Sequence, residues 1–219
     1  MVKGIIFDAD GTLLDSMMIW KDAGRLYLES LGYKVKENLE EIMFDMTMAE
    51  GAEYMKKNYG LKLMEDEIIH GVNSRVYDFY AEDVEPKTGV KEFLEYVYFK
   101  DIPMTIATST DRLMIEAALK RTGFDKYIKK IFTTTEVGKG KSNPDIFIAA
   151  MKEMKSSADE TWLFEDAAYS METAKKIGLH TVGIYDFSSM NHQEEVKGLS
   201  DIYIKNWKQY PYVIEKMNI

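Results

Sequence analysis

The chain has 219 residues, which allows one domain or one and a half at ~150 residues per domain and is enough to bury a sizeable core. Its 28 basic and 37 acidic residues give a formal net charge of −9, which argues against nonspecific binding to nucleic acid or to a membrane surface. With no cysteine, disulfides, zinc–thiolate sites and a thiol nucleophile are excluded. No apolar run approaches the ~20 residues of a membrane helix, and the first apolar stretch ends in an Asp pair unlike a signal peptide, so we expect a cytoplasmic protein.

The N-terminal part of the chain predicts one strand followed by helices. The apolar run Gly4–Phe7 closes with Asp-Ala-Asp-Gly, which is typical of a buried strand that ends in a loop. Apolar side chains at steps of three and four predict a helix over 17–31, and residues 36–58 and 64–82 predict two more. We expect no strand between residues 15 and 85.

After Pro86, short apolar runs alternate with helical segments. The predicted strands cover 102–107, 131–134, 161–164, 181–184 and 202–204, and the predicted helices cover 88–99, 111–122, a segment from 144 and a segment ending at 177. Such alternation predicts βαβ units, and hence an α/β, doubly wound, Rossmann-like fold with a mostly parallel sheet. The predicted core domain is 1–14 plus 86–219, and residues 15–85 form an inserted α-helical domain.

Polar side chains follow three of the predicted strands where each strand ends. They are Asp8 and Asp10, then Thr108, Ser109 and Thr110, then Glu165 and Asp166. Ligands of open parallel sheets bind beyond the carboxyl ends of the strands, so we expect these groups to converge there.

The acidic groups of this set predict a metal site. Asp8 and Asp10 leave a strand two residues apart, and Gly11 permits the bend that turns both toward one pocket. With Glu165 and Asp166 added, four carboxyls meet at one edge, which favours a hard divalent cation, above all Mg²⁺. The alternative for Asp8–Gly11 alone is a polar turn that caps a strand, and the second acidic pair argues against it.

Cationic and hydroxyl groups at the same edge predict phosphate binding. Lys141 precedes a helix and can offset the carboxylates and hold a phosphate oxygen, although a solvated loop lysine is the alternative. Thr108 and Ser109 precede a helix and can bind phosphate or simply cap that helix. Gly140-Lys-Ser is not a P-loop, because position 135 is Thr instead of the required Gly.

Together these groups predict phosphoryl transfer to a carboxylate. Asp8 would attack phosphorus to form an acyl-phosphate, and Asp10 would protonate the leaving oxygen and then activate water. Mg²⁺ and Lys141 would screen the charge on the nucleophile and on the transferring group.

Four ordered motifs carry a family resemblance: Asp8-Ala-Asp-Gly-Thr-Leu-Leu-Asp15, Ile106-Ala-Thr-Ser-Thr110, Gly140-Lys-Ser-Asn-Pro-Asp-Ile-Phe147 and Leu163-Phe-Glu-Asp166. Because it carries these four motifs in this order, the chain resembles the haloacid dehalogenase-like superfamily. The resemblance implies that Asp8 is the nucleophile and a metal ligand, and that Asp10 is the general acid/base and binds metal through its carbonyl. It further implies a phosphate-binding hydroxyl at Thr108, the motif lysine at Lys141, and a metal ligand at Asp166 with Glu165 beside it.

Residues 15–85 resemble the small α-helical cap of the subfamily that includes β-phosphoglucomutase and many sugar-phosphate phosphatases. The resemblance implies a cap that closes over the site with hinges near 14–16 and 83–87. Three departures from the usual motifs stand out. Ser142 replaces Pro, Ala167 replaces a Ser and so removes a hydroxyl near the metal, and Ser170 and Thr173 stand where small Gly and Ala are common.

The second carboxylate separates the possible reactions. Dehalogenases and phosphonatases of the superfamily lack an Asp at the position of Asp10, so Asp10 favours an oxygen leaving group. The mutase pattern has a histidine early in the cap, where this chain has 18–21, and an arginine in a specificity loop that corresponds roughly to 45–50; both are absent.

We therefore predict a Mg²⁺-dependent phosphatase for a small phosphomonoester such as a sugar phosphate, with a β-phosphoglucomutase-like mutase as the alternative. A regulatory protein that has lost catalysis is disfavoured, because Asp8 and Asp10 are both present. The expected partner is a small phosphorylated metabolite, without nucleic acid or membrane, and a monomer is favoured.

Overall fold

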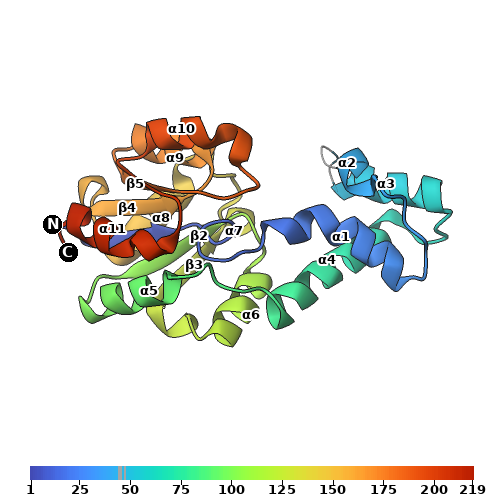
Figure 1. The fold of residues 1–219 in the computed structure, drawn as a ribbon, viewed down its shortest axis with the longest axis horizontal. Helices are drawn as coiled ribbons and strands as arrows, with labels where there is room; N and C mark the ends of the chain where they lie inside the picture. Colours follow the sequence, from blue (N-terminus) through green and yellow to red (C-terminus); the bar gives the residue numbers. More distant parts are fainter. Residues whose placement is uncertain (44–45, 47) are drawn as a thin grey trace. The chain divides into compact units, whose positions relative to one another are not determined.

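The computed structural model describes the whole chain except Phe44, Asp45, Thr47 and the side chain of Glu41. The predicted specificity loop at 45–50 therefore lies partly outside the described residues. The chain divides into two compact units, one formed by Met1–Asp15 with Val84–Ile219 and the other by Ser16–Asp83 (Figure 1). We call them the core unit and the helical unit. No helix among the described residues has the length and apolar character of a membrane span.

The core unit is built on a six-stranded, all-parallel sheet (Figure 1). Its strands are β1 (Gly4–Phe7), β2 (Met104–Thr108), β3 (Ile128–Thr133), β4 (Thr161–Glu165), β5 (His180–Ile184) and β6 (Ile202–Ile204). Their order in the sheet is β3-β2-β1-β4-β5-β6, so the chain winds outward from β1 in both directions. The carboxyl ends of β1 and its two neighbours thus meet at the point where ligands of such sheets bind.

Helices cover both faces of this sheet. They are α5 (Val90–Phe99), α6 (Arg112–Thr122), α7 (Thr134–Val137), α8 (Asp145–Met154), α9 (Ala168–Lys176), α10 (Gln193–Leu199) and α11 (Tyr210–Met217). Because strand side chains alternate, Ile6 and Leu163 point to one face and pack with Phe147 of α8 and Ala174 of α9.

Aromatic rings fill the opposite face. Phe7 and Phe164 lie there with centroids 5.0 Å apart, and Phe93 of α5 packs 5.2 Å from Phe164. Trp207 stacks on Phe164 at 5.4 Å and 8°, and its indole N–H donates to the carbonyl of Thr12 at 2.8 Å. The aromatic layer therefore packs under the loop that follows β1 and is bonded to it through Trp207.

The helical unit contains α1 (Met17–Ser30), α2 (Leu39–Met43), α3 (Met48–Tyr59) and α4 (Glu65–Glu82). Among its described residues it has no strand, as the sequence predicts. α1 and α4 pack closely at Gly71, where an added Cβ would lie 2.1 Å from the ring of Tyr27. A side chain at this position would force the two helices apart.

Three details of the fold differ from the predicted elements. The single helix expected over 36–58 is two helices: α2 ends at Met43, whose carbonyl accepts a hydrogen bond from the N–H of Met46, and α3 begins at Met48. The strand expected at 131–134 begins at Ile128, and its lysines on the exposed edge of the sheet hide the apolar pattern. The helices α7, α10 and α11 were not expected; α10 buries little besides Val196, so its sequence lacks an apolar face.

Candidate active site

The loop after β1 carries the first two predicted site residues. Asp8 continues the strand, and its N–H bonds to the carbonyl of Phe164 on β4 at 2.9 Å. The chain then reverses: Gly11 adopts a φ of 79°, and the N–H groups of Leu13 and Leu14 both bond to the carbonyl of Ala9 at 2.9 Å. Glycine adopts this left-handed conformation without strain, and the bend keeps Asp8 and the residues after it at the sheet edge.

Lys141 reaches this edge from the loop before α8. Its side chain is only 3% exposed, and its ammonium contacts Asp8 Oδ1 and lies 3.0 Å from Glu165 Oε2. Burial lowers the pKa of Lys141, but the charges of Asp8 and Glu165 outweigh burial and raise that pKa above its usual value. Lys141 is therefore a permanent cation, and the alternative of a solvated loop lysine is wrong.

Glu165 accepts four hydrogen bonds. Lys141 and the hydroxyl of Ser170 donate to Oε2 at 3.0 and 2.6 Å, and the N–H groups of Asp166 and Ala167 donate to Oε1, both at 3.2 Å. A carboxylate offers about four lone-pair sites, so the protein itself already satisfies this one. This arrangement suits a group that holds Lys141 in place better than one that binds an ion.

Asp8, Glu165 and Asp166 form a buried cluster, with one carboxylate oxygen from each within 4.8 Å of the others. Three carboxylates and one lysine leave a formal charge of −3 + 1 = −2. Burial, followed by the charge of Glu165, raises the pKa of Asp8 and of Asp166 well above the usual range. Hard oxygen donors and a residual charge of −2 fit a divalent cation such as Mg²⁺, so the donor set matches the metal that the sequence predicts.

Asp10 is held by the strand end of β2. The hydroxyl of Thr110 donates to Asp10 Oδ2 at 2.7 Å, and the hydroxyl of Thr108 lies 3.5 Å from the same oxygen. The N–H of Thr110 in turn donates to Thr108 Oγ1 at 3.0 Å. The predicted residues at the ends of β1 and β2 therefore converge, and Asp10 is fixed beside Asp8 by a hydroxyl.

The model of the family described as haloacid dehalogenase-like hydrolase matches residues 5–184. The chain belongs to this family. The phosphorylated carbohydrates phosphatase of Thermotoga maritima is 26% identical over 181 residues, which cover 83% of this chain and 84% of that protein.

Solved structures show the same fold as this hydrolase. One from Thermotoga maritima, named for β-phosphoglucomutase, has a TM-score of 0.86 and 24% identity, and the match covers 98% of this chain and 99% of that one. CbbY from Rhodobacter sphaeroides, in complex with phosphate, has a TM-score of 0.77 and 19% identity over 100% of both chains. The predicted family, the α/β fold and the enzyme class, a hydrolase of phosphoric monoesters, are confirmed.

Not every predicted site residue joins the cluster of this hydrolase. Ser109 is exposed, and no side-chain bond links it to the described residues of the site. Thr110, expected at this edge but not singled out as a site residue, is the donor that orients Asp10. One signal in the sequence could have identified Thr110, because it follows the same strand as Thr108.

Two other neighbours of the cluster were also missed. Ser170 is fully buried and bonds Glu165, although in the sequence it stands out only as a departure from a small residue. Tyr169 lies on the first turn of α9, where burial and the charge of Glu165 raise the pKa of its phenol. The role of Ser170 cannot be recognised from spacing, because its side chain reaches the site from within a helix.

Proposed function

We propose that this hydrolase is a Mg²⁺-dependent phosphatase that cleaves a small phosphomonoester through an aspartyl-phosphate. The observation that carries the proposal is the buried cluster of Asp8, Lys141, Glu165 and Asp166, with a charge of −2 and Asp10 held beside it. The name of the Thermotoga maritima relative supports a phosphorylated carbohydrate as the substrate class. The cytoplasmic location and the monomeric state stay predictions of the sequence.

The residues divide the chemistry between two steps. In the first, an oxygen of Asp8 forms a bond to phosphorus, the bond from phosphorus to the leaving oxygen breaks, and Asp10 gives that oxygen a proton. In the second, water attacks phosphorus, Asp10 takes its proton, and Asp8 and inorganic phosphate are released. Each carboxyl thus returns to its starting state.

The remaining groups bind charge. Asp8 and Asp166 would hold the metal, together with the Asp10 carbonyl, whereas Glu165 would position Lys141. Mg²⁺, when bound, screens the negative charge on the nucleophile and on the phosphoryl oxygens. Lys141 would add a fixed cation to the same group, and the hydroxyl of Thr108 would donate to a phosphoryl oxygen.

Phosphate release from a panel of small phosphomonoesters tests this function, with Mg²⁺ and with a chelator. We expect release that depends on Mg²⁺, with sugar monophosphates among the best substrates. Asp8→Asn should be inactive, and Asp125→Asn, the same change at an exposed position outside the site, should match the wild type. Isomerised sugar without net phosphate release, primed by a bisphosphorylated sugar, would instead establish the mutase.

Trapping the phospho-enzyme separates the two steps of the reaction. Asp10→Asn removes the acid and base but keeps the nucleophile, so a slowly hydrolysed phospho-enzyme should accumulate with a substrate whose leaving group needs no proton. Intact-mass spectrometry would detect one added phosphoryl group. Its absence from Asp10→Asn under conditions where the wild type turns over would contradict an aspartyl-phosphate with Asp10 as the activating base.

A further inference from the structure

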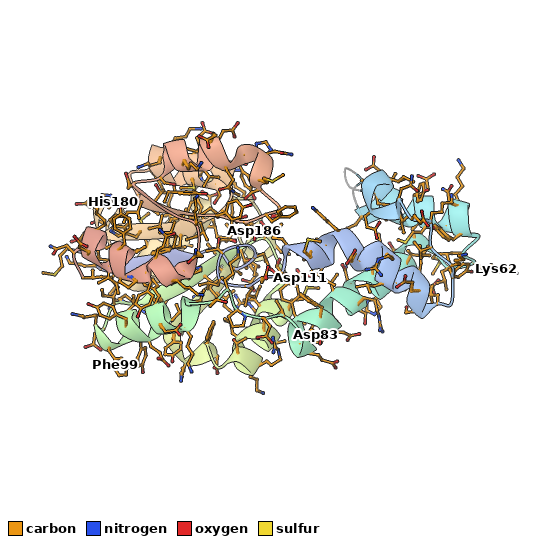
Figure 2. The ribbon with its side chains drawn as sticks, in the orientation of Figure 1. Lys62, Asp83, Phe99, Asp111, His180 and Asp186 are labelled. Atoms are coloured by element: carbon orange, nitrogen blue, oxygen red, sulfur yellow. The ribbon has the colours of Figure 1, made fainter. Side chains whose placement is uncertain are left out.

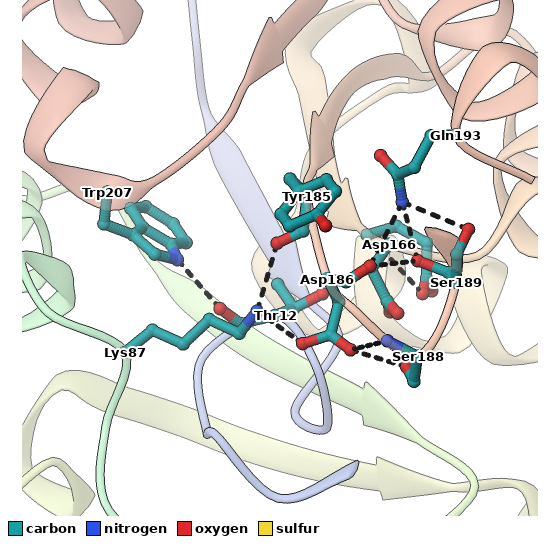
Figure 3. A network of polar contacts seen from close by, with 10 residues as sticks. Thr12, Lys87, Asp166, Tyr185, Asp186, Ser188, Ser189, Gln193 and Trp207 are labelled. Atoms are coloured by element: carbon teal, nitrogen blue, oxygen red, sulfur yellow. Dashed lines mark hydrogen bonds and ion pairs between the residues drawn. The ribbon is translucent and has the colours of Figure 1, made fainter. Parts of the chain in front are cut away.

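A second lysine, half-buried, lies at the carboxyl end of the sheet. Lys87, in the segment that leads into α5, donates to Asp186 Oδ2 at 2.6 Å and to the carbonyl of Tyr185 at 3.1 Å (Figure 3). The side chains of Lys87 and Asp186 are 16% and 7% exposed. Nothing in the sequence motifs points to this ion pair, because its members are 99 residues apart.

Both partners are fixed by further bonds. The N–H of Lys87 donates to the carbonyl of Leu13 at 2.9 Å, in the loop that carries Asp8. The N–H and hydroxyl of Ser188 donate to Asp186 Oδ1 at 2.8 and 2.5 Å. The pair is thus a built feature of the core unit, unlike an exposed ion pair whose geometry costs side-chain entropy.

The pair stands next to the carboxylate cluster. β4 and β5 are parallel neighbours with Glu165 opposite Gly183, so Asp166 and Asp186 leave adjacent strands at the same edge. Figure 3 shows Asp166 beside Asp186, and Figure 2 places Asp186 in the core unit at the end of β5 opposite to His180. After burial, Glu165 and Asp8, the charge of Asp186 is the next cause that raises the pKa of Asp166.

The lysine cancels this additional carboxylate. Without Lys87, Asp186 would add a negative charge to a cluster that already carries −2, and without Asp186 the lysine would add a positive one. We propose that Lys87 and Asp186 form a charge-balancing pair that sets the affinity of the Asp8–Asp166 cluster for its divalent cation. This inference rests on the metal site of the proposed function, and it names Lys87 and Asp186 as residues that act through Asp166.

Two single variants distinguish charge balancing from a purely structural role of the pair. Asp186→Asn leaves the Lys87 cation unbalanced and should weaken Mg²⁺ binding, whereas Lys87→Met leaves the Asp186 anion unbalanced and should tighten it. One unit charge close to a divalent ion, near the surface of a protein, changes affinity roughly 10-fold or more. A purely structural role would instead disturb the site, and weaken binding, in both variants.

Calorimetric titration of the metal-free protein with Mg²⁺ measures the affinity of each variant for the cation. A second titration uses Mn²⁺, whose electron spin resonance signal reports how much of the ion is bound. We expect dissociation constants about 10-fold higher for Asp186→Asn, about 10-fold lower for Lys87→Met, and near the wild-type value for the double variant. The control is the ion pair of Lys175 and Asp201, whose side chains are both 35% exposed. Lys175→Met should leave the metal affinity unchanged.

The outcomes separate this inference from the proposed function. Equal affinities in all variants, or weaker binding in both single variants, would overturn the charge-balancing pair even if phosphatase activity depends on Mg²⁺. Opposite shifts in a protein that releases no phosphate would support the pair and refute the phosphatase. If Lys87→Met does not fold, Lys87→Gln and the isosteric Asp186→Asn still allow the metal affinities of the two single variants to be compared. A wild type that binds no divalent cation would refute the inference.

Discussion

Lys141 and Lys87 both lie at the carboxyl edge of one sheet, Lys141 buried and Lys87 half-buried, and they face different numbers of carboxylates. Lys141 contacts Asp8 and Glu165, with Asp166 next to them, so the group around it keeps a charge of −2. Lys87 pairs with one carboxylate among the described residues, that of Asp186, and hydrogen bonds from Ser188 complete a neutral pair. The two regions use the same residue types, but one carries a net negative charge and the other is neutral.

The difference separates a reactive region from a supporting one. A balanced pair needs no ligand, because its charges and hydrogen bonds are satisfied within the protein. An unbalanced cluster raises the pKa of Asp8 and Asp166 through burial and through the neighbouring carboxylates, so it gains from a cation or from protons. In this fold, the excess of carboxylates over lysines distinguishes the proposed reactive site from the supporting ion pair.

The largest effect on turnover should come from a substitution in the negatively charged cluster. Asp8→Asn keeps the shape of the nucleophile but removes its charge, so turnover should fall by on the order of 10⁴-fold or more. Steady-state phosphate release measures this loss, and circular dichroism confirms the fold. Activity near the wild-type level in this variant would refute the covalent mechanism.

Removing Lys141 should lower the free energy of unfolding more than removing Lys87 does. Lys141→Met leaves Asp8 and Glu165 without their buried cation and should lower the free energy of unfolding by about 3–5 kcal/mol in chelator. Lys87→Met leaves one carboxylate that Ser188 still hydrogen-bonds, so its loss should be about 1–3 kcal/mol. Urea denaturation at pH 7.5 compares the two, and equal losses would mean that the charge balance does not distinguish the regions.

Asp166→Asn should stabilise the metal-free protein at neutral pH. A carboxyl whose pKa is raised by folding contributes stability below its unfolded pKa of about 4, and that contribution is lost as pH rises through the folded value. Charged Asp166 therefore opposes folding at pH 7.5, and the amide removes about 1–2 kcal/mol of this cost.

Melting curves in chelator should show the advantage of Asp166→Asn shrink as the pH falls toward about 4, where the wild-type carboxyl is protonated. With Mg²⁺ the order should reverse, since a ligand that binds only the folded state stabilises it. A metal-free variant that melts below the wild type at pH 7.5 would show that Asp166 contributes bonds that outweigh its charge.

Much of this fold could be predicted because its signals are local. β1, β2 and β4 are short apolar runs that end in polar residues, and their alternation with helices predicts a parallel sheet. β3 and α10 gave weaker signals, because an edge strand with two exposed lysines and a helix with one buried apolar side chain lack a clear period. The order of the sheet follows from right-handed crossovers rather than from any single segment.

The site could be predicted only in part, for a related reason. Asp8, Asp10, Lys141 and Asp166 lie in motifs whose spacing is fixed by strand ends, so the sequence places them together. The residues that hold these groups come from elsewhere. The sequence predicts Thr110 at this edge but not its bond to Asp10, and the pair of Lys87 with Asp186 depends on which loops are neighbours in space, which spacing along the chain does not reveal.

The smallest expected effect concerns a hydroxyl that the sequence indicates is missing. Ala167 lacks the serine oxygen expected after Asp166, but Ser170, one turn into α9, donates to Glu165 Oε2 at 2.6 Å. Ser170→Ala would leave that oxygen with Lys141 alone, so Lys141 should be positioned less firmly. Turnover should fall roughly 3- to 10-fold at saturating Mg²⁺, with little change in KM, which corresponds to about one hydrogen bond.

A second hydroxyl on the same helix provides the control for Ser170→Ala. Thr173 is also buried, but its hydroxyl donates to the carbonyl of Tyr169 at 3.0 Å and reaches no carboxylate. Thr173→Val should therefore lose a similar amount of stability, about 1 kcal/mol, and keep its turnover. If the two variants lose stability and turnover alike, Ser170 only supports the packing of α9. If Ser170→Ala alone loses turnover, the hydroxyl acts on the site through Glu165 and Lys141.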